Sequence, residues 1–219
     1  MDWSFIAKYI PMYVEAAEFT LKIGIIGILC AIAAGLICSI IVYYRIPVFC
    51  QVVKLYVELS RNTPLLVQLF FLYFGLPKAG IVISATSCGI IGLTFLGGSY
   101  MAEAFRSGLE TVSLSQKESG LALGFRKSQI MRYIIFPQAI SVSVPAVCAN
   151  MIFLIKETSV FSVLALPDLM YVTKDLIGLY YKTDEALFML VVAYLIILLP
   201  ISIIAHIAER RLRHAAFGN

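Results

Sequence analysis

The chain has 219 residues, of which 61% are hydrophobic and only 14% are charged, and its mean hydropathy is +0.92. Soluble domains carry roughly 25% charged residues, so this composition excludes an ordinary soluble domain and indicates an integral membrane protein. The formal net charge of +4 is typical of the basic loops of membrane proteins. It gives no reason to expect a nucleic-acid partner.

The hydrophobic runs predict an all-α membrane protein with five transmembrane helices. Four runs without charged residues are roughly 22–24 residues long, enough to cross about 30 Å of hydrocarbon: 23–44, 79–102, 133–155 and 186–208. A fifth run, 62–77, is short and reaches spanning length if its helix begins near Gln51. That helix would include Glu58 and Arg61, which are three residues apart and therefore able to pair on one face.

The Lys and Arg residues of the loops predict the orientation. Five spans place the two termini on opposite sides of the membrane. The side that holds the loop 103–132 and the C-terminal residues 210–219 carries the larger and denser set of basic residues, and is therefore expected to be cytoplasmic. The N-terminus is then outside and the C-terminus inside.

The sequence divides into three parts on this view. Residues 1–18 are expected to be an external amphipathic segment, with an interfacial helix over 5–19, residues 19–209 the transmembrane domain, and 210–219 a basic cytoplasmic tail. The stretch 157–185 is expected outside. Because it contains several apolar residues, it is predicted to dip partly into the protein.

Several residues within the spans have both a packing and a functional interpretation. Pro137 and Pro145 each remove a helix donor, which fits either ordinary transmembrane prolines or a bent helix along a translocation path. In Arg61-Asn62-Thr63-Pro64, Thr63 and Pro64 form a helix-start signal, which marks a simple kink or a hinge. Arg61 would reach the interface or pair with Glu58.

Small and polar residues in the third and fourth spans predict close helix contacts. Gly97-Gly98-Ser99 allows near approach of a neighbouring helix, with a dimer contact as the alternative. Asn150 is interpreted as a hydrogen-bonding residue between helices, and a wet cavity is the other environment in which such residues occur.

The segment Ser115–Phe125 is the clearest functional signal. Ser115 and Glu118 have the spacing of a capping box, and Gly124 stands where a helix ends in the left-handed conformation. The intervening helix of about two turns presents Leu121 and Leu123. A short helix of this kind in a cytoplasmic loop predicts a docking element for a soluble partner.

No catalytic set is present in the sequence. It has no GxxxxGK[ST] phosphate loop, HExxH or GxSxG motif, and its five Cys and two His have no metal-ligand pattern. The chain is therefore not expected to be an enzyme or to bind a metal or cofactor of its own. If transport uses ATP, another chain must bind it.

These residues resemble the permeases of ABC importers. Glu118-Ser119-Gly120, Gly124 and Pro137 are similar to the EAA loop of that family, which has Glu-Ala-Ala, a later Gly and a final Ile-Leu-Pro. The wider pattern covers nearly the whole chain and is similar to the polar amino acid permeases of the histidine/glutamine/opine type. It includes Arg61–Gln68, Tyr100, Ala102-Glu103, Arg106, Gly108, Gln116, Ala122–Gly124, Pro137–Ala139, Pro145, Asn150, Lys156 and Thr158-Ser159.

The resemblance implies a type I importer in the bacterial inner membrane. Its partners would be two ATP-binding-cassette subunits that hold ATP-Mg, a second permease that is identical or homologous, an external substrate-binding protein, and membrane lipid. Closure of the ATPase pair would pull the loop helix and switch the spans between inward-open and outward-open. The substrate would be a polar amino acid or a close relative.

The resemblance also implies two sets of site residues. Coupling to the ATPase would rest on Glu118, Ser119, Gly120, Leu121, Ala122, Leu123, Gly124 and Phe125. The translocation path or its gates would include Arg61, Thr63, Pro64, Tyr100, Glu103 and Asn150.

The chain departs from the family pattern at Ser119 and Gly120, which replace two alanines, and at Phe136, which replaces Leu of Ile-Leu-Pro. Gly120 is expected to loosen the short helix by about 1 kcal/mol relative to Ala.

Two other function classes are weaker interpretations. A secondary transporter or channel that works alone would bury ionisable residues near the bilayer midplane, and the long runs have none. A membrane-embedded enzyme would need clustered catalytic groups. Neither alternative explains a capped helix in a cytoplasmic loop.

Overall fold

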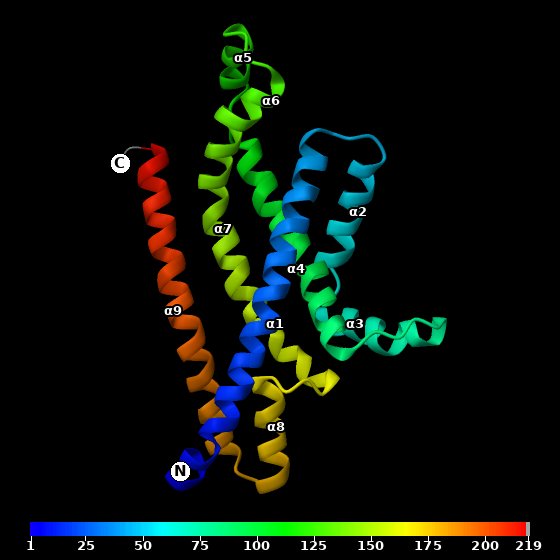
Figure 1. Cartoon of the computed structure of the whole chain (residues 1–219), viewed down its shortest axis with the longest axis vertical. Coiled ribbons are helices and arrows are strands. Elements are labelled where there is room, and N and C mark those ends of the chain that lie inside the picture. Colours follow the sequence, from blue (N-terminus) through cyan, green and yellow to red (C-terminus); the bar gives the residue numbers. More distant parts are fainter. Residues whose placement is uncertain (218–219) are drawn as a thin grey trace.

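The computed structural model describes residues 1–217, which form helices and turns without a β-strand (Figure 1). The helices are α1 (Trp3–Tyr43), α2 (Phe49–Arg61), α3 (Leu65–Phe70), α4 (Ala85–Glu110), α5 (Leu114–Ala122), α6 (Lys127–Ile130), α7 (Phe136–Glu157), α8 (Leu169–Tyr180) and α9 (Thr183–Phe217). Short π-helical or 3₁₀ segments follow some of them, at Phe71–Gly75, Leu76–Ala79, Met131–Ile135 and Thr158–Leu164. The all-α prediction is confirmed.

Helix α1 is a single helix of 41 residues that passes through Pro11. Residues 5–19, which were expected to form an interfacial helix, are helical and continue directly into the first span; their interfacial position stays a prediction. Tyr13 of this stretch is buried against other helices. Its hydroxyl donates to the Ala186 carbonyl at 2.9 Å and lies 2.9 Å from Thr173 Oγ1.

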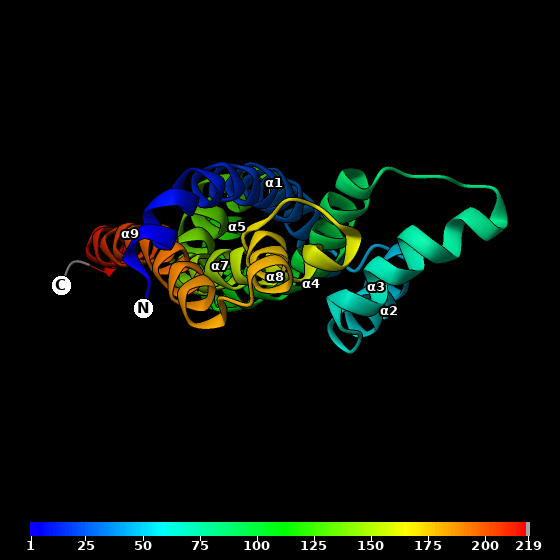
Figure 2. The ribbon, with the colours of Figure 1, turned by 90° about the horizontal axis from the view of Figure 1, so that it is seen from below.

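The predicted second span is broken into two helices that point in different directions. In Figure 1, α2 runs beside the upper part of α1, whereas α3 turns sideways and projects away from the bundle. Seen from below in Figure 2, α2 and α3 project to one side of the other helices. The apolar segment Leu65–Ala79 is too short to cross about 30 Å of hydrocarbon at 1.5 Å per residue.

Four helical segments of the described chain are long and apolar enough to cross a membrane: Trp3–Tyr43, Ala85–Glu110, Lys127–Leu164 and Thr183–Arg211. The fifth predicted span thus remains a prediction. Helix α9 continues to Phe217, past residue 210 where a separate tail was expected, and residues 218–219 of that tail lie outside the described part of the chain.

Helix α4 lies at the centre of the bundle, with α1, α2 and α7 packed against it. Its small residues permit this, as Gly97-Gly98-Ser99 predicts. A Cβ atom on Gly97 would lie 2.6 Å from Leu154 Cδ1 and 2.8 Å from Ala31 Cβ, and one on Gly98 would lie 2.6 Å from the Tyr56 hydroxyl. The close-packing interpretation is confirmed, and these contacts all lie within the chain.

The chain between α7 and α9 folds back into the protein, as predicted. Phe161 and Asp168 are completely buried. Asp168 Oδ1 accepts a hydrogen bond from the Tyr171 N–H at 2.9 Å and caps α8. Its other carboxylate oxygen, Oδ2, is buried and has no hydrogen-bond partner among the described residues.

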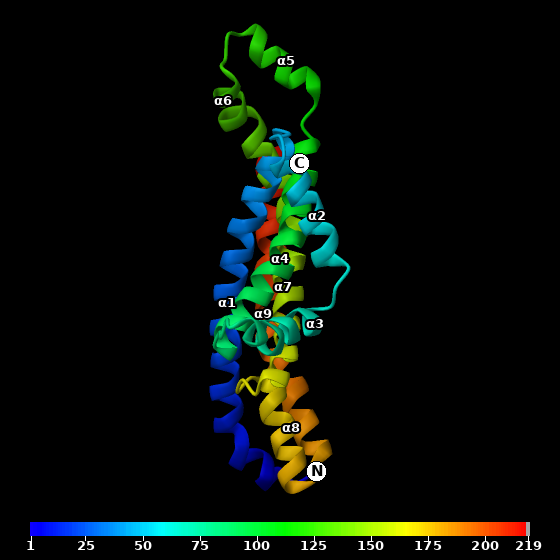
Figure 3. The same cartoon turned by 90° about the vertical axis from the view of Figure 1, so that its right-hand side faces the viewer.

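The bundle has two distinct ends. Helices α5 and α6 form a hairpin at one end, which we call the α5 end (Figure 3). The beginning of α1 and the turn between α8 and α9 lie at the other end (Figure 1). The π-helical turn Met131–Ile135 joins the hairpin to α7 just before Pro137, as expected where a proline disturbs the helix ladder.

Candidate functional site: an exposed helical hairpin and a charged cavity

Helix α5 begins two residues earlier than the capping-box pattern predicts. Its N-cap is Ser113, whose Oγ accepts a hydrogen bond from the Gln116 N–H at 3.4 Å. Ser115 and Glu118 lie inside the helix, so the prediction that they form the cap is wrong. Ser113 and Gln116 have the same three-residue spacing, so the correct signal was present in the sequence beside the wrong one.

The predicted end of α5 at Gly124 is confirmed. Gly124 has φ +81°, and Leu123 is the C-cap. The Phe125 N–H donates to the Gly120 carbonyl at 3.0 Å, and the Gly124 N–H donates to the Leu121 carbonyl at 2.9 Å. These two bonds form a Schellman motif, which satisfies the last carbonyls of the helix.

The apolar side chains of α5 and its flanks are exposed. The exposed fractions are 72% for Leu114, 52% for Leu121, 76% for Leu123 and 39% for Phe125. Helix α5 and its flanks lie between two segments that are long enough to span a membrane, Ala85–Glu110 and Lys127–Leu164, at the projecting end of the molecule (Figure 3). Apolar groups gathered in this way on a projecting element are typical of a protein interface. Glu118, Ser119 and Ala122 are exposed on the same helix.

Gly120 has a packing role that its low helix propensity does not predict. It is buried on the inner side of the hairpin. A Cβ atom at this position would lie 2.9 Å from Ile134 Cδ1 and 3.0 Å from Ile130 Cγ1. The missing side chain therefore lets α5 lie close against α6 and the turn before α7. This close packing offsets the stability that α5 loses through the low helix propensity of Gly120.

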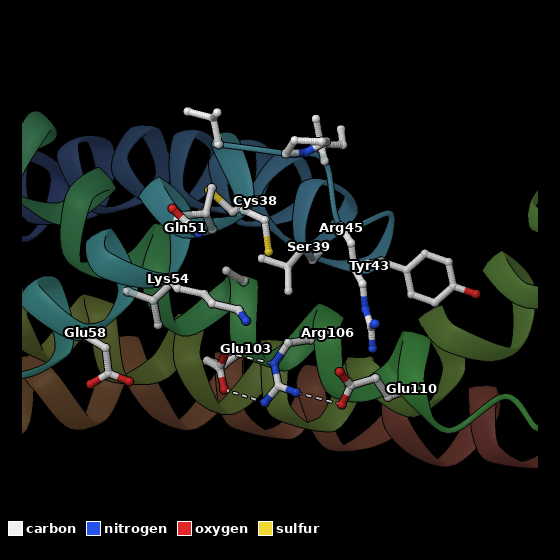
Figure 4. A pocket seen from close by; sticks show the side chains of 18 of the residues that line it. Cys38, Ser39, Tyr43, Arg45, Gln51, Lys54, Glu58, Glu103, Arg106 and Glu110 are labelled. Carbon is white, nitrogen blue, oxygen red and sulfur yellow. Dashed lines mark hydrogen bonds and ion pairs between the residues drawn. The ribbon is translucent and has the colours of Figure 1, made fainter.

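A cavity of about 880 Å³ lies between the last turns of α1, the loop 45–48, α2 and α4 (Figure 4). It contains Arg61 and Glu103 of the predicted path residues. Its lining is rich in charged side chains of both signs, which are Arg45, Lys54, Glu58, Arg61, Glu103, Arg106 and Glu110.

Arg106 holds two carboxylates in place along α4. Its Nε and Nη2 atoms donate to the two Glu103 oxygens at 3.0 and 2.9 Å, and its Nη1 donates to Glu110 Oε2 at 2.7 Å. Such two-pronged contacts fix geometry as well as charge. Glu103, Arg106 and Glu110 follow the i, i+3, i+7 spacing of one helix face, a signal from which Arg106 and Glu110 could have been predicted as site residues.

Arg61 reaches across from α2 to α4. Its Nη1 lies 3.7 Å from Glu103 Oε2, and its guanidinium carbon lies 5.2 Å from the centre of the Tyr100 ring. The expected pairing with Glu58 is wrong: the Glu58 carboxylate instead accepts from Asn62 Nδ2 at 3.3 Å. Arg61, Tyr100 and Glu103 are thus brought together as one charged and aromatic group.

Asn150 connects to this group from α7. Its Nδ2 donates to the Tyr100 carbonyl at 3.2 Å, and the Phe153 ring lies 5.2 Å from the Tyr100 ring. The interpretation of Asn150 as a hydrogen bond between helices is confirmed.

Thr63 and Pro64 lie at the break between α2 and α3 and do not line the cavity. Pro64, in extended conformation with ψ 144°, is the N-cap of α3, so the expected arrangement with Thr63 as cap and Pro64 inside the helix is wrong by one residue. Thr63 Oγ1 donates back to the Leu59 carbonyl at 2.8 Å and accepts from Gln68 Nε2 at 3.0 Å. Among the described side chains, no group of three or more His, Cys, Asp or Glu could hold a metal ion.

Comparison with known proteins identifies the family. A family model described as a binding-protein-dependent transport system inner membrane component matches residues 23–214. This chain belongs to that family. The resemblance to ABC transporter permeases is therefore confirmed, and the permease is a multi-pass protein of the inner membrane and a transport subunit by family.

Relatives of the permease match it over almost its whole length. It is 35% identical over 213 residues to a probable amino-acid permease, YxeN, of Bacillus subtilis, covering 96% of this chain and 95% of the relative. It is 31% identical over 214 residues to the glutamine transport system permease GlnP of Escherichia coli, covering 97% and 98% of the two chains.

Solved structures show the same fold. A chain of an amino acid ABC transporter crystallised with histidines has a TM-score of 0.90 and 30% identity, covering 96% of the permease and 99% of that chain. A chain of the methionine transporter MetNI in an inward-facing conformation has a TM-score of 0.78, 18% identity, and coverage of 92% and 96%. The fold is that of a type I ABC permease.

Proposed function

We propose that this permease is the membrane subunit of an ATP-driven importer of polar amino acids or their close derivatives. The names of its relatives support this substrate class, since they include an amino-acid permease and a glutamine permease. ATP and its Mg²⁺ bind to a partner ATPase dimer. A second permease, identical or homologous, and an external substrate-binding protein complete the importer.

The observation that carries the proposal is the exposed apolar surface of the α5 hairpin. Leu121, Leu123 and Phe125 would enter a groove of the ATPase, where they lose their contact with water. Each buried leucine contributes about 1.5–3 kcal/mol. Glu118 lies on the same exposed helix and adds a charge that a basic residue of the partner would recognise.

The same proposal predicts how the permease is oriented in the membrane. The α5 end would be cytoplasmic, since an ATPase is found there, and the beginning of α1 would be outside. The basic residues of the loop 103–132 favour this direction. Leu65–Ala79 would complete the fifth span together with its neighbours in the assembled importer.

The charged cavity supports a path for zwitterionic substrates. Arg61 and Glu103 present opposite charges 3.7 Å apart. An amino acid entering between them would place its carboxylate on Arg61 and its ammonium group on Glu103, replacing their mutual contact. Tyr100 and Asn150 would position this pair from α4 and α7, and Thr63 with Pro64 would form a gate hinge between α2 and α3.

The coupling role is tested with the double variant Glu118→Lys and Leu121→Asp. The matched control is Leu179→Asp, which places the same charge at an exposed leucine of α8 near the opposite end. The permease is expressed with its ATPase, and the ATPase retained on purification and the ATP-dependent uptake are measured. We expect both to fall strongly in the double variant, with normal ATPase retention in the control. Retention and uptake equal to wild type in the double variant would refute the coupling role.

The path role is tested with Glu103→Gln and Arg61→Gln. Both variants should keep ATPase binding, because the cavity is separate from α5, while uptake of amino acids falls by about tenfold or more, as expected on loss of a charged hydrogen bond. Full uptake in both variants would show that the substrate passes elsewhere.

A further inference from the structure

A second, chemically different groove lies between α1 and α7, with α4 as its floor. Its volume is about 250 Å³. Leu36 and Ile40 line it from α1, Phe105 from α4, and Phe136 and Ile140 from α7. Figure 1 shows α1 and α7 separating toward the α5 end with α4 between them. The groove lies between these two diverging helices.

The groove offers almost no polar partner to a ligand. Two of its lining residues carry hydroxyl groups, Ser143 and Tyr44. The Ser143 hydroxyl already donates to the Ala139 carbonyl at 2.8 Å, and Tyr44 stands at the rim. A peptide or a sugar would leave its polar groups unpaired there, which costs free energy. An alkyl chain has no polar groups and would leave none unpaired.

One cationic side chain stands at the rim. Arg132 lines the groove at its α5 end together with Tyr44. Arg61 and Arg106 both pair with carboxylates, but Arg132 has no ion pair among the described residues, and its recorded contact is with the neighbouring Tyr133 ring at 5.8 Å. It is exposed, so it remains available for an anion.

The length of the groove along α1 matches the outer part of a lipid acyl chain. Leu36 and Tyr44 both line it and are eight residues apart on the final turns of α1, which is about 12 Å along a helix. The rim residues Tyr44 and Arg132 lie at the C-cap of α1 and in the turn before α7. Tyrosine and arginine are typical anchors at the membrane–water interface, so we place the rim at the level of the lipid headgroups.

We propose that the groove holds one acyl chain of an anionic phospholipid, whose phosphate pairs with Arg132. The surrounding membrane supplies this ligand, and the cation explains a preference for anionic over zwitterionic headgroups. Bound in this way, the lipid fills the space between α1 and α7 at the α5 end.

The test uses the full-length permease in nanodiscs of equal parts phosphatidylglycerol and phosphatidylcholine, released for native mass spectrometry. Arg132→Gln removes the headgroup partner, and Lys127→Gln is its control, with the same charge change in the same loop but outside the groove. Ile140→Trp fills the groove, and Ile203→Trp is its control on the exposed surface of α9.

We expect wild type and both controls to retain one lipid per chain, with phosphatidylglycerol preferred about fivefold, the effect of one cation near an anionic headgroup. Arg132→Gln should lose the preference, and Ile140→Trp should lose the retained lipid whatever its headgroup. An unchanged preference in Arg132→Gln, an equal loss in Lys127→Gln, or a retained lipid in Ile140→Trp would overturn the proposal. A dimer of the chain without retained lipid would overturn it too, because a second copy would then fill the groove.

Discussion

The crossing of α1 and α4 depends on the absence of a side chain at Gly35. A Cβ atom there would overlap Met101 Cβ and would lie 2.8 Å from the Ala102 nitrogen and 2.8 Å from the Met101 carbonyl carbon. Two of these three atoms belong to the backbone, so no rotamer change can remove the overlap. Gly35→Ala must therefore push α1 away from α4.

The size of the effect follows from two opposing contributions. Overpacking costs about 1–3 kcal/mol, and contact with backbone places Gly35→Ala at the upper end of that range. Replacing Gly by Ala in a helix returns up to about 1 kcal/mol. We expect a net loss of stability of about 2 kcal/mol.

Gly24→Ala is the matched control in the same helix. Its Cβ would lie 3.7 Å from Thr158 Cγ2 and 3.9 Å from Ile155 Cγ1, which are ordinary van der Waals distances, so only the helix-propensity gain of up to about 1 kcal/mol should remain.

The assay is thermal unfolding of the purified permease in detergent. A change of 1 kcal/mol shifts the melting temperature of a chain of this size by about 2–4 °C. Gly35→Ala should melt about 4–8 °C below wild type, whereas Gly24→Ala should melt at or slightly above it. If Gly35→Ala melts as high as Gly24→Ala, the two helices do not cross through backbone contact at this position.

Three further predictions concern other parts of the molecule. Burial raises the pKa of Asp168 from 3.8 to about 6, so the folded protein binds this proton more tightly than the unfolded chain. The free energy of unfolding of the permease should therefore fall by about 3 kcal/mol as the pH rises from 3.8 to about 6 and Asp168 loses its proton. Asp168→Asn keeps the cap on α8 and should remove this part of the pH dependence of the melting temperature; a slope equal to wild type would contradict the burial argument. Gly124→Val should strain the left-handed end of α5 by about 1–2 kcal/mol and speed limited proteolysis of the hairpin, whereas Gly124→Asn, which tolerates positive φ better, should stay closer to wild type; equal cleavage rates would argue against the Schellman end. Arg106→Lys keeps the charge but loses the two-pronged contact with Glu103, so it should lower amino acid uptake nearly as much as Arg106→Gln; normal uptake in Arg106→Lys would show that charge alone is sufficient.

The parts of the fold that the sequence predicts are those set by local chemistry. Gly124 ends α5 because a left-handed residue is needed there, and Gly97 and Gly98 lie at helix contacts because only small residues fit. The end of a run without charged residues is a weaker guide to where a helix begins or ends. Helix α1 extends through Glu15, Glu18 and Lys22, since charged residues do not interrupt a helix that emerges from the hydrocarbon.

The parts that the sequence does not predict depend on contacts between distant residues. Glu58 and Glu103 are both plausible partners for Arg61, and only the placement of α2 against α4 selects Glu103. Ser113 and Ser115 are both suitable caps, and the choice depends on where α4 ends, at Glu110. Gly120 has low helix propensity, and its benefit requires Ile130 and Ile134 to lie opposite.

The contact at Gly120 also determines how stiff the hairpin is. Since the α5 backbone lies directly against Ile130 and Ile134, the short helix and the base of α7 have little room to move relative to each other. A push on α5 would then cause less bending of the connecting loop and would instead tilt α7, which carries Asn150 and its hydrogen bond to α4. Gly120, which has the poorest helix propensity in α5, therefore makes the connection between the hairpin and α7 rigid.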